Sequence, residues 1–193
     1  MRVLALDIST KTGIALLCGN MGDSVPELVS TELVQQDQNK EPYPWNYLIR
    51  ANQLADKVVS VVSGYAPDVI VIEELNSARA RLTQKLLSFL HCMILQRLRE
   101  QCPGVKVAYI STSAWRKVTQ VALSKQDKDI NRKINQGKSK KELGVKGKTT
   151  TKHVSVRVAN EMYGKEYKTK DNDITDAILL GVAYFRGAPE VTD

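Results

Sequence analysis

Four consecutive β-branched residues, Val69-Ile70-Val71-Ile72, constrain the fold of this chain more than any other stretch. A strand with one face in water alternates apolar and polar residues, whereas this run has no polar position. Such runs are typical of strands covered on both faces, as in sheets flanked by helices on each side. A second apolar run, Val3-Leu4-Ala5-Leu6, has the same character. The sequence therefore predicts a sheet whose central strands are buried.

The other periodic segments predict the order of elements around these two strands. Strands are expected over residues 3–7, 14–18, 28–34, 69–72 and 105–110, with Lys11-Thr12-Gly13 as the turn of a first hairpin. Apolar residues recur at helical spacing from Trp45 to Val62 and from Leu82 to Ile94. Further helices are expected after a cap at Ser113, over residues 152–162 and over residues 173–185. A meander followed by right-handed crossovers gives an α/β fold, a five-stranded mixed sheet flanked by helices, in a single domain of residues 1–193.

Carboxylates follow both apolar strands. Asp7 comes directly after the first run, and Glu73 comes directly after the second. In sheets of this kind the ligand site lies at the carboxyl ends of the strands. Near the C terminus, Asp173 and Asp176 are three residues apart, which places them on one face of the first turn of a helix. Four such acids cannot all stay ionised in a semi-buried cleft without cations, so they predict a site for two Mg²⁺ ions, which Mn²⁺ can replace.

Each acid also has a purely structural explanation. Asp7 could accept hydrogen bonds from backbone amides in its own turn. Asp171, together with the acids that follow it, could cap a helix and offset its dipole. Glu74 could be a surface acid, because alternation lets only one residue of the Glu73-Glu74 pair face the cleft. The occurrence of acids after two buried strands and again at a helix start favours the metal site.

The net charge of +7 is concentrated in one segment. Residues 124–152 hold ten of the 28 Lys and Arg residues but only three of the 21 acids, so the rest of the chain is neutral overall. A polyanion such as nucleic acid is the natural partner of this segment. The alternative is a solvated, partly disordered loop that aids solubility. We expect a basic insertion at about residues 124–150.

Nothing in the sequence resembles a secretory signal, and no apolar stretch is long enough to cross a bilayer. The three cysteines have no CxxC spacing, which is typical of reduced thiols. We expect a cytoplasmic protein with no membrane partner.

Three segments together resemble a known family, the RuvC-type Holliday-junction resolvases of the ribonuclease H-like superfamily. They are LALDISTKTGIAL, VIVIEE and DNDITDAILLG, and the resemblance extends over the whole chain. It places the family's catalytic acids on Asp7, Glu73, Asp173 and Asp176. It implies a homodimeric, Mg²⁺-dependent endonuclease from a bacterium or a phage. Such an enzyme nicks two opposed strands of branched DNA near the crossover and leaves 5′-phosphate and 3′-hydroxyl ends.

The resemblance also assigns basic residues to the DNA. The family uses such residues near the scissile phosphate, and by position they look like Lys117 and Lys152. Further contacts to DNA are expected from the basic segment, at Lys138, Lys140, Lys141, Lys146 and Lys148. Many relatives carry an aromatic residue shortly after the catalytic Glu that wedges into the junction. Residues 73–79 contain none, so any wedge must come from elsewhere.

Three other functions fit parts of the sequence. DISTKTGIAL resembles the first phosphate loop of actin- and hexokinase-type ATPases, but those proteins need two such domains and this chain is too short for both. A ribonuclease H-like nuclease acting on RNA or on an RNA–DNA hybrid would use the same carboxylates. A non-catalytic protein that binds branched nucleic acid would need only the basic segment, although unpaired acids near phosphate would weaken its binding.

Overall fold

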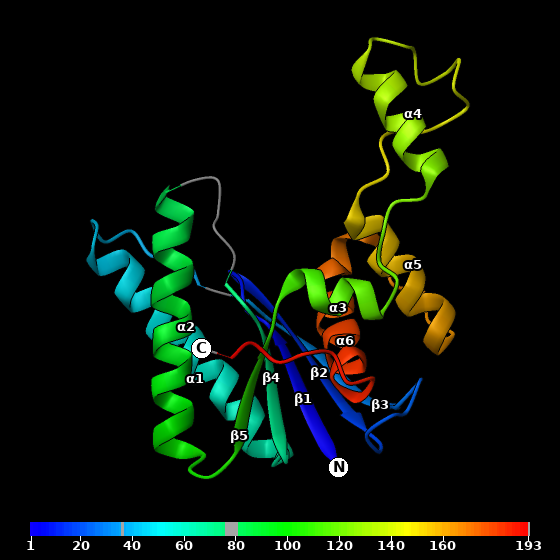
Figure 1. The fold of residues 1–193 in the computed structure, drawn as a ribbon. Helices are drawn as coiled ribbons and strands as arrows, with labels where there is room; N and C mark the ends of the chain where they lie inside the picture. Colours follow the sequence, from blue (N-terminus) through cyan, green and yellow to red (C-terminus); the bar gives the residue numbers. More distant parts are fainter. Residues whose placement is uncertain (36, 76–80, 193) are drawn as a thin grey trace.

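A computed structural model describes residues 1–35, 37–75 and 81–192 of the chain (Figure 1). Its single sheet contains β1 (Arg2–Asp7), β2 (Lys11–Cys18), β3 (Glu27–Gln35), β4 (Val69–Glu73) and β5 (Lys106–Ile110). The strand order is β3-β2-β1-β4-β5. β2 is antiparallel to β1 and β3, whereas β4 is parallel to β1 and β5. The predicted α/β class with a five-stranded mixed sheet is confirmed.

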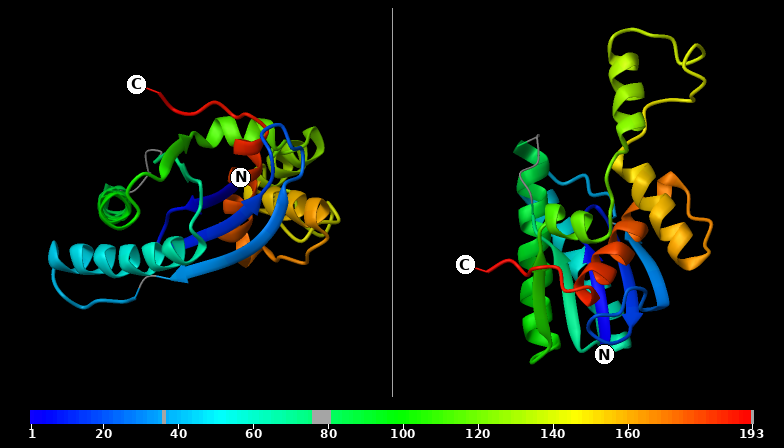
Figure 2. Two further views of the ribbon diagram at one scale, coloured as in Figure 1. Left: turned by 90° about the horizontal axis from the view of Figure 1, so that it is seen from below. Right: turned by 45° about the vertical axis from the view of Figure 1, so that its right-hand side comes forward.

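Helices cover both faces of this sheet (Figure 2). They are α1 (Trp45–Tyr65), α2 (Arg81–Gln101), α3 (Thr112–Val118), α4 (Lys125–Asn135), α5 (Thr151–Tyr163) and α6 (Asn172–Phe185), with a short 3₁₀ turn, η1 (Thr169–Asp171). α1 and α2 pack on one face, while α6, flanked by α3 and α5, packs on the other. No helix among the described residues is both long enough and apolar enough to span a membrane.

The side chains of β1 alternate between two hydrophobic clusters. Val3 and Ala5 pack in the cluster that contains α6, whereas Leu4 and Leu6 pack in the cluster that contains α1 and α2. All four are fully buried, and β4 alternates in the same way. Since both faces are covered by helices, neither strand has a position at which a polar side chain would reach water, which explains the two uninterrupted apolar runs.

α6 lies unusually close to the sheet, because Gly181 faces it. A Cβ atom at Gly181 would meet the side chain of Leu17 and would lie 3.3 Å from Cβ of Ala5. The absence of a side chain therefore lets the helix axis approach β1 and β2. This close packing fixes the position of the first turn of α6 relative to the strand ends.

Two local predictions are wrong. Lys11-Thr12-Gly13 is not the hairpin turn, since β2 already begins at Lys11. The turn before it is closed early by side chains: the Ser9 hydroxyl donates to the Lys11 carbonyl at 2.9 Å, and the Thr12 hydroxyl donates to the Ser9 carbonyl at 2.9 Å. Likewise Ser111, and not Ser113, caps α3, and its side chain accepts a hydrogen bond from the backbone N–H of Ala114.

Residues 124–150 form a projecting unit that we call the basic arm (Figure 1). The alternative of a partly disordered loop is wrong for its first half, which is the helix α4. A capping box starts this helix: Ser124 Oγ accepts from the Asp127 N–H at 3.0 Å, and Asp127 accepts from the Ser124 N–H at 3.1 Å. None of the eleven residues of α4 is buried. Local hydrogen bonds therefore account for this helix, and hydrophobic packing does not.

Candidate active site and nucleic-acid interface

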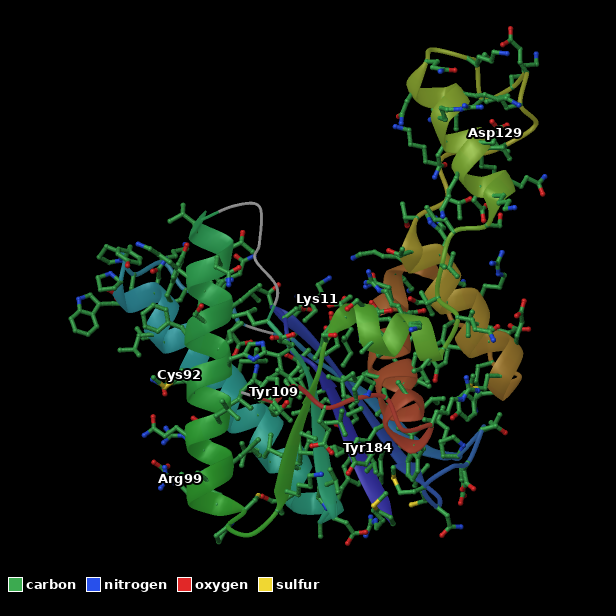
Figure 3. The ribbon with its side chains drawn as sticks, viewed as in Figure 1. Lys11, Cys92, Arg99, Tyr109, Asp129 and Tyr184 are labelled. Carbon is green, nitrogen blue, oxygen red and sulfur yellow. The ribbon has the colours of Figure 1, made fainter. Side chains whose placement is uncertain are left out.

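Asp7 and Glu73 lie side by side at one edge of the sheet. β1 and β4 are parallel neighbours, and Leu6 pairs with Ile72 in their register. The next residue of each strand, Asp7 or Glu73, therefore reaches the same edge. Lys11, the first residue of β2, marks this edge in Figure 3. The parallel pairing on which the sequence prediction depended is present.

Gly13 brings the start of α6 to the same edge. In the pairing of β1 with β2, Gly13 lies opposite Asp7. A Cβ atom at Gly13 would collide with the backbone carbonyl of Asp173 and would lie 2.8 Å from the backbone nitrogen of Ile174, closer than real Cβ atoms come. Glycine at this position thus allows the first turn of α6, which carries Asp173 and Asp176, to touch the hairpin.

The pKa of Asp7 shows that the four predicted acids share one electrostatic environment. It is raised well above its usual range, first by burial and then by the charges of Glu73, Asp176 and Asp173. The ammonium group of Lys152 acts in the opposite direction and lowers it. Four acids from three distant segments of the chain, together with one predicted lysine, therefore act on the same point. We call the set of Asp7, Glu73, Asp173 and Asp176 the acidic edge.

Asp176 is the most enclosed member of this set, with 8% of its surface exposed. Burial raises its pKa to about 6, and the charges of Glu73 and Asp173 add to the rise. The hydroxyl of Ser155 and the guanidinium of Arg116 oppose it. Asp176 Oδ1 is buried and makes no hydrogen bond within the described part of the chain, and Ser155 Oγ is in the same state. The Ser155 hydroxyl is thus near enough to act on Asp176 without reaching hydrogen-bond geometry.

Hydrogen bonds orient the other two members. The Thr112 hydroxyl at the start of α3 donates a short hydrogen bond to Glu73 Oε1. Asn172 Nδ2 donates to Asp173 Oδ1 at 2.7 Å, and Asn172 Oδ1 accepts from Lys152 Nζ at 3.3 Å. Sequence reasoning assigned no role to Thr112 or Asn172. The sequence signal for Asn172 was a polar residue between two aspartates at a predicted helix start. In the structure this residue is buried.

The four carboxylates of the acidic edge are donors of the chemical type that binds a hard divalent cation such as Mg²⁺ or Mn²⁺. Carboxylate oxygens are the ligands these ions prefer, and the unsatisfied Oδ1 of Asp176 is an acceptor with a vacant bonding position. Within the described residues, no three Asp, Glu, His or Cys side chains are drawn together closely enough to hold an ion. Like charges repel, so carboxylates without a cation are expected to stay apart.

The helix α3 also brings toward the acids a basic residue that was not predicted. Lys117 is exposed on the last turn of α3. Its neighbour Arg116 is partly buried, lowers the pKa of Asp176, and has a buried Nε without a hydrogen bond in the described residues. The Arg116 guanidinium carbon also lies 5.0 Å from the centre of the Trp115 ring. Arg116 is therefore a third residue that sequence reasoning missed, after Thr112 and Asn172.

The predicted DNA-contacting lysines lie on the basic arm, in the loop that follows α4. All five are exposed: Lys138, Lys140, Lys141, Lys146 and Lys148. The basic residues of α4 itself are partly neutralised, because Asp129 forms ion pairs of 2.6 Å with both Arg132 and Lys133. Figure 3 shows Asp129 on the arm, away from the sheet.

A clasp of two hydrogen bonds closes the arm at its base, next to the start of α5. Asn131 Nδ2 donates to the Thr149 carbonyl at 2.7 Å, and the Thr149 N–H donates to Asn131 Oδ1 at 3.0 Å. The next residue, Thr150, is the N-cap of α5, and Lys152 follows in the first turn. The end of the arm and Lys152 therefore share one anchor.

No family model and no curated protein matches the chain. Solved structures do match it along its full length. RuvC of Thermus thermophilus in complex with a Holliday junction substrate has a TM-score of 0.65 and 17% identity, over 99% of each chain. A second structure of Thermus thermophilus RuvC has a TM-score of 0.66 and 14% identity, over 99% of this chain and 100% of that one.

The yeast mitochondrial Holliday junction resolvase Ydc2 is also similar, with a TM-score of 0.54 and 14% identity, over 96% of this chain and 79% of that chain. At these identities the similarity is one of fold. The chain therefore has the fold of RuvC-type resolvases, as the sequence resemblance predicted.

Proposed function

We propose that this protein is a metal-dependent endodeoxyribonuclease that resolves Holliday junctions or other branched DNA by paired nicks near the crossover. The observation that carries the proposal is the acidic edge: the pairing of β1 with β4 brings Asp7 and Glu73 together, and Gly13 lets the first turn of α6 touch the same edge. A fold shared with RuvC from Thermus thermophilus, whose structure contains a Holliday junction, supports the choice of substrate.

In this proposal the four acids hold two Mg²⁺ ions, and Mn²⁺ can replace them. When bound, such ions stabilise charge on the phosphate undergoing attack and on the leaving oxygen, and they make water acidic enough to attack. Asp7 and Glu73 hold the site from the sheet, which fixes their spacing. Asp173 and Asp176 close it from α6. Lys152, whose charge acts on Asp7, would contact the scissile phosphate.

The basic arm supplies the remaining DNA contacts in this proposal. Its exposed lysines would neutralise backbone phosphates without reading sequence, and Lys117 would add a contact from α3. A homodimer would offer two such sites to two opposed strands, which paired nicking requires. The homodimer and a cytoplasmic location stay predictions. Residues 76–79 of the segment in which relatives carry a wedging aromatic lie outside the described residues.

The decisive test compares wild type with Asp7→Asn on five substrates: a four-way junction, a three-way junction, a flap, a linear duplex and an RNA–DNA hybrid. We expect wild type to cut the branched DNAs in Mg²⁺ and Asp7→Asn to cut none. The variant should still bind the four-way junction in Ca²⁺, because the basic arm is intact. Equal cutting of all five substrates would contradict a resolvase. Preferred cutting of the hybrid would favour the alternative function as a ribonuclease H-like nuclease.

A further inference from the structure

The side chain of Asn172 lies between a cation and an anion of the candidate site. Its Oδ1 accepts from Lys152 Nζ at 3.3 Å, and its Nδ2 donates to Asp173 Oδ1 at 2.7 Å. Asn172 is 8% exposed, so its amide is largely shielded from water, whereas its partner Lys152 is exposed. A buried amide whose two ends both reach charged groups is held by them in a single orientation.

The chemistry of the three groups explains why an amide stands at this position. An ammonium group can only donate hydrogen bonds, and an ionised carboxylate can only accept them. A carboxamide accepts at one end and donates at the other, so it can join the two. An aspartate at position 172 could accept from Lys152 but would repel Asp173, and an apolar side chain could do neither.

Without this amide, the Lys152 ammonium would be free to pair with a carboxylate of the acidic edge. The charge of Lys152 already acts on Asp7. A direct ion pair with Asp173 would occupy carboxylate lone pairs that a divalent cation needs, and it would place a positive charge at the cation's position. The single hydrogen bond from Asn172 leaves Asp173 Oδ2 outside the contact with the amide.

We propose that Asn172 is a positioning residue that separates Lys152 from Asp173, so that the lysine stays beside the site and the carboxylate stays available to a divalent cation. This inference rests on the proposed function, since it assigns the acidic edge to metal. The inference adds one condition to the presence of the four acids. Lys152 must be held away from them for the metal to bind tightly.

The test is the affinity of the protein for Mn²⁺ alone, measured from the electron paramagnetic resonance signal of the free ion. Asn172→Leu keeps the branching at Cγ and removes both hydrogen bonds. We expect it to bind Mn²⁺ about 10-fold more weakly than wild type, the usual effect of losing a group that orients a metal ligand. In Asn172→Leu combined with Lys152→Gln, the affinity should return to within about threefold of Lys152→Gln alone, because the competing ammonium is gone.

Thr175→Val is the matched control. The Thr175 hydroxyl donates to the backbone carbonyl of Asn172 at 3.0 Å and is buried in the same helical turn. Its loss perturbs the start of α6 without touching the amide, and Mn²⁺ affinity should stay within about twofold of wild type. If Asn172→Leu does not fold, as judged by thermal unfolding, Asn172→Ala takes its place.

Three results would overturn the inference: unchanged affinity in the Asn172 variant, a loss that persists when Lys152 is also replaced, or an equal loss in Thr175→Val. If wild type binds Mn²⁺ and cuts junctions while the Asn172 variant matches it, only the role of Asn172 fails. If wild type neither binds Mn²⁺ nor cuts junctions, the proposed function fails together with it.

Discussion

Carboxylates of the acidic edge and of the basic arm have pKa values shifted in opposite directions. At the edge, burial is the first cause of a raised pKa in both Asp7 and Asp176, and neighbouring acids add to it. In the arm, the pKa of Asp127 is lowered by hydrogen bonds from Ser124, and the pKa of Asp129 is lowered by Lys133 and Arg132. The charges of the edge oppose folding, whereas those of the arm are satisfied locally.

The acidic edge and the basic arm are held in place by different interactions. The edge is held by the register of the sheet and by the packing of α6, so the hydrophobic core supports an arrangement of acids that repel one another. The arm depends on its own capping box, ion pairs and clasp. Changes at the edge should therefore alter stability and metal binding together, while changes in the arm should alter DNA affinity and leave the core intact.

Gly13→Ala should have the largest effect, because it breaks the edge at the point where α6 meets the hairpin. The new methyl group would collide with the backbone of Asp173, which cannot move as a side chain can. We expect cleavage of a four-way junction to fall at least about 100-fold through misplacement of the acids, and stability to fall by about 1–3 kcal/mol. Rates under single-turnover conditions and urea unfolding would measure the two effects.

Gly64→Ala is the control for that change. Gly64 lies in the last turn of α1, and an added Cβ there meets nothing within 4 Å. The substitution should stabilise the protein by about 0.5–1 kcal/mol and leave cleavage unchanged. Equal cleavage by the two alanine variants would contradict the role given to Gly13.

Asp176→Asn should stabilise the metal-free protein in a pH-dependent manner. The pKa of Asp176 is about 6 in the folded protein, above the usual 3.8, so the folded state favours the protonated form. Its contribution to stability is present below pH 3.8 and is lost as the pH rises through 6. At pH 8 in EDTA the variant should be more stable than wild type by up to about 3 kcal/mol, and at pH 4 the difference should fall to about 0.5 kcal/mol.

Urea unfolding at the two pH values measures this difference. The same variant should lose Mn²⁺ binding. The carboxylate that lowers stability would then be the one that the proposed function needs. A variant that is less stable than wild type at pH 8 would show that Asp176 is a structural cap.

Replacing the five exposed arm lysines with Gln should weaken junction binding by about 10- to 100-fold at moderate salt. Each lost phosphate contact reduces the slope of log affinity against log salt by about one, so the slope should become shallower by up to about five. The urea midpoint should not change, because these side chains are exposed. An unchanged slope of log affinity against log salt would indicate that the arm lysines do not contact the DNA. The substituted residues are Lys138, Lys140, Lys141, Lys146 and Lys148.

Asp129→Asn should have the smallest effect on junction affinity. The direction of the change tells whether the ion pairs of Asp129 keep Arg132 and Lys133 from the DNA. Asp129 pairs with Arg132 and Lys133, so its neutralisation would release both to contact phosphate. We expect junction affinity to rise by about twofold, since exposed ion pairs are weak. Fluorescence anisotropy with a labelled junction in Ca²⁺ is sensitive enough. A fall in affinity would indicate that the pairs orient α4 for binding.

The two central strands, and the position of Asp7 and Glu73 at their ends, were predictable because both follow from a local sequence pattern. Uninterrupted apolar runs gave β1 and β4, and the acid that ends each run had to lie at a strand end. Gly13 was misread as a turn residue because glycine is common in turns. Glycine is needed there because the start of α6 approaches its backbone. Since Asp173 comes 160 positions later in the chain, the sequence around Gly13 gives no sign of this contact.

The residues that orient the acids could not be inferred in the same way. Arg116 and Lys117 are adjacent on α3, and successive residues of a helix point about 100° apart, so position alone does not select between them. Asn172 acquires its partners from α5 through folding. The helix α4 was missed although Ser124 and Asp127 have the spacing of a capping box, because the high density of charge and glycine favoured a loop.

The most direct test of the central claim is a crystal structure of the protein in Mn²⁺ with an anomalous difference map. The account predicts two manganese peaks between the ends of β1 and β4 and the first turn of α6, with oxygen ligands from Asp7, Glu73, Asp173 and Asp176. Manganese bound elsewhere, with these four carboxylates making only protein contacts, would contradict it.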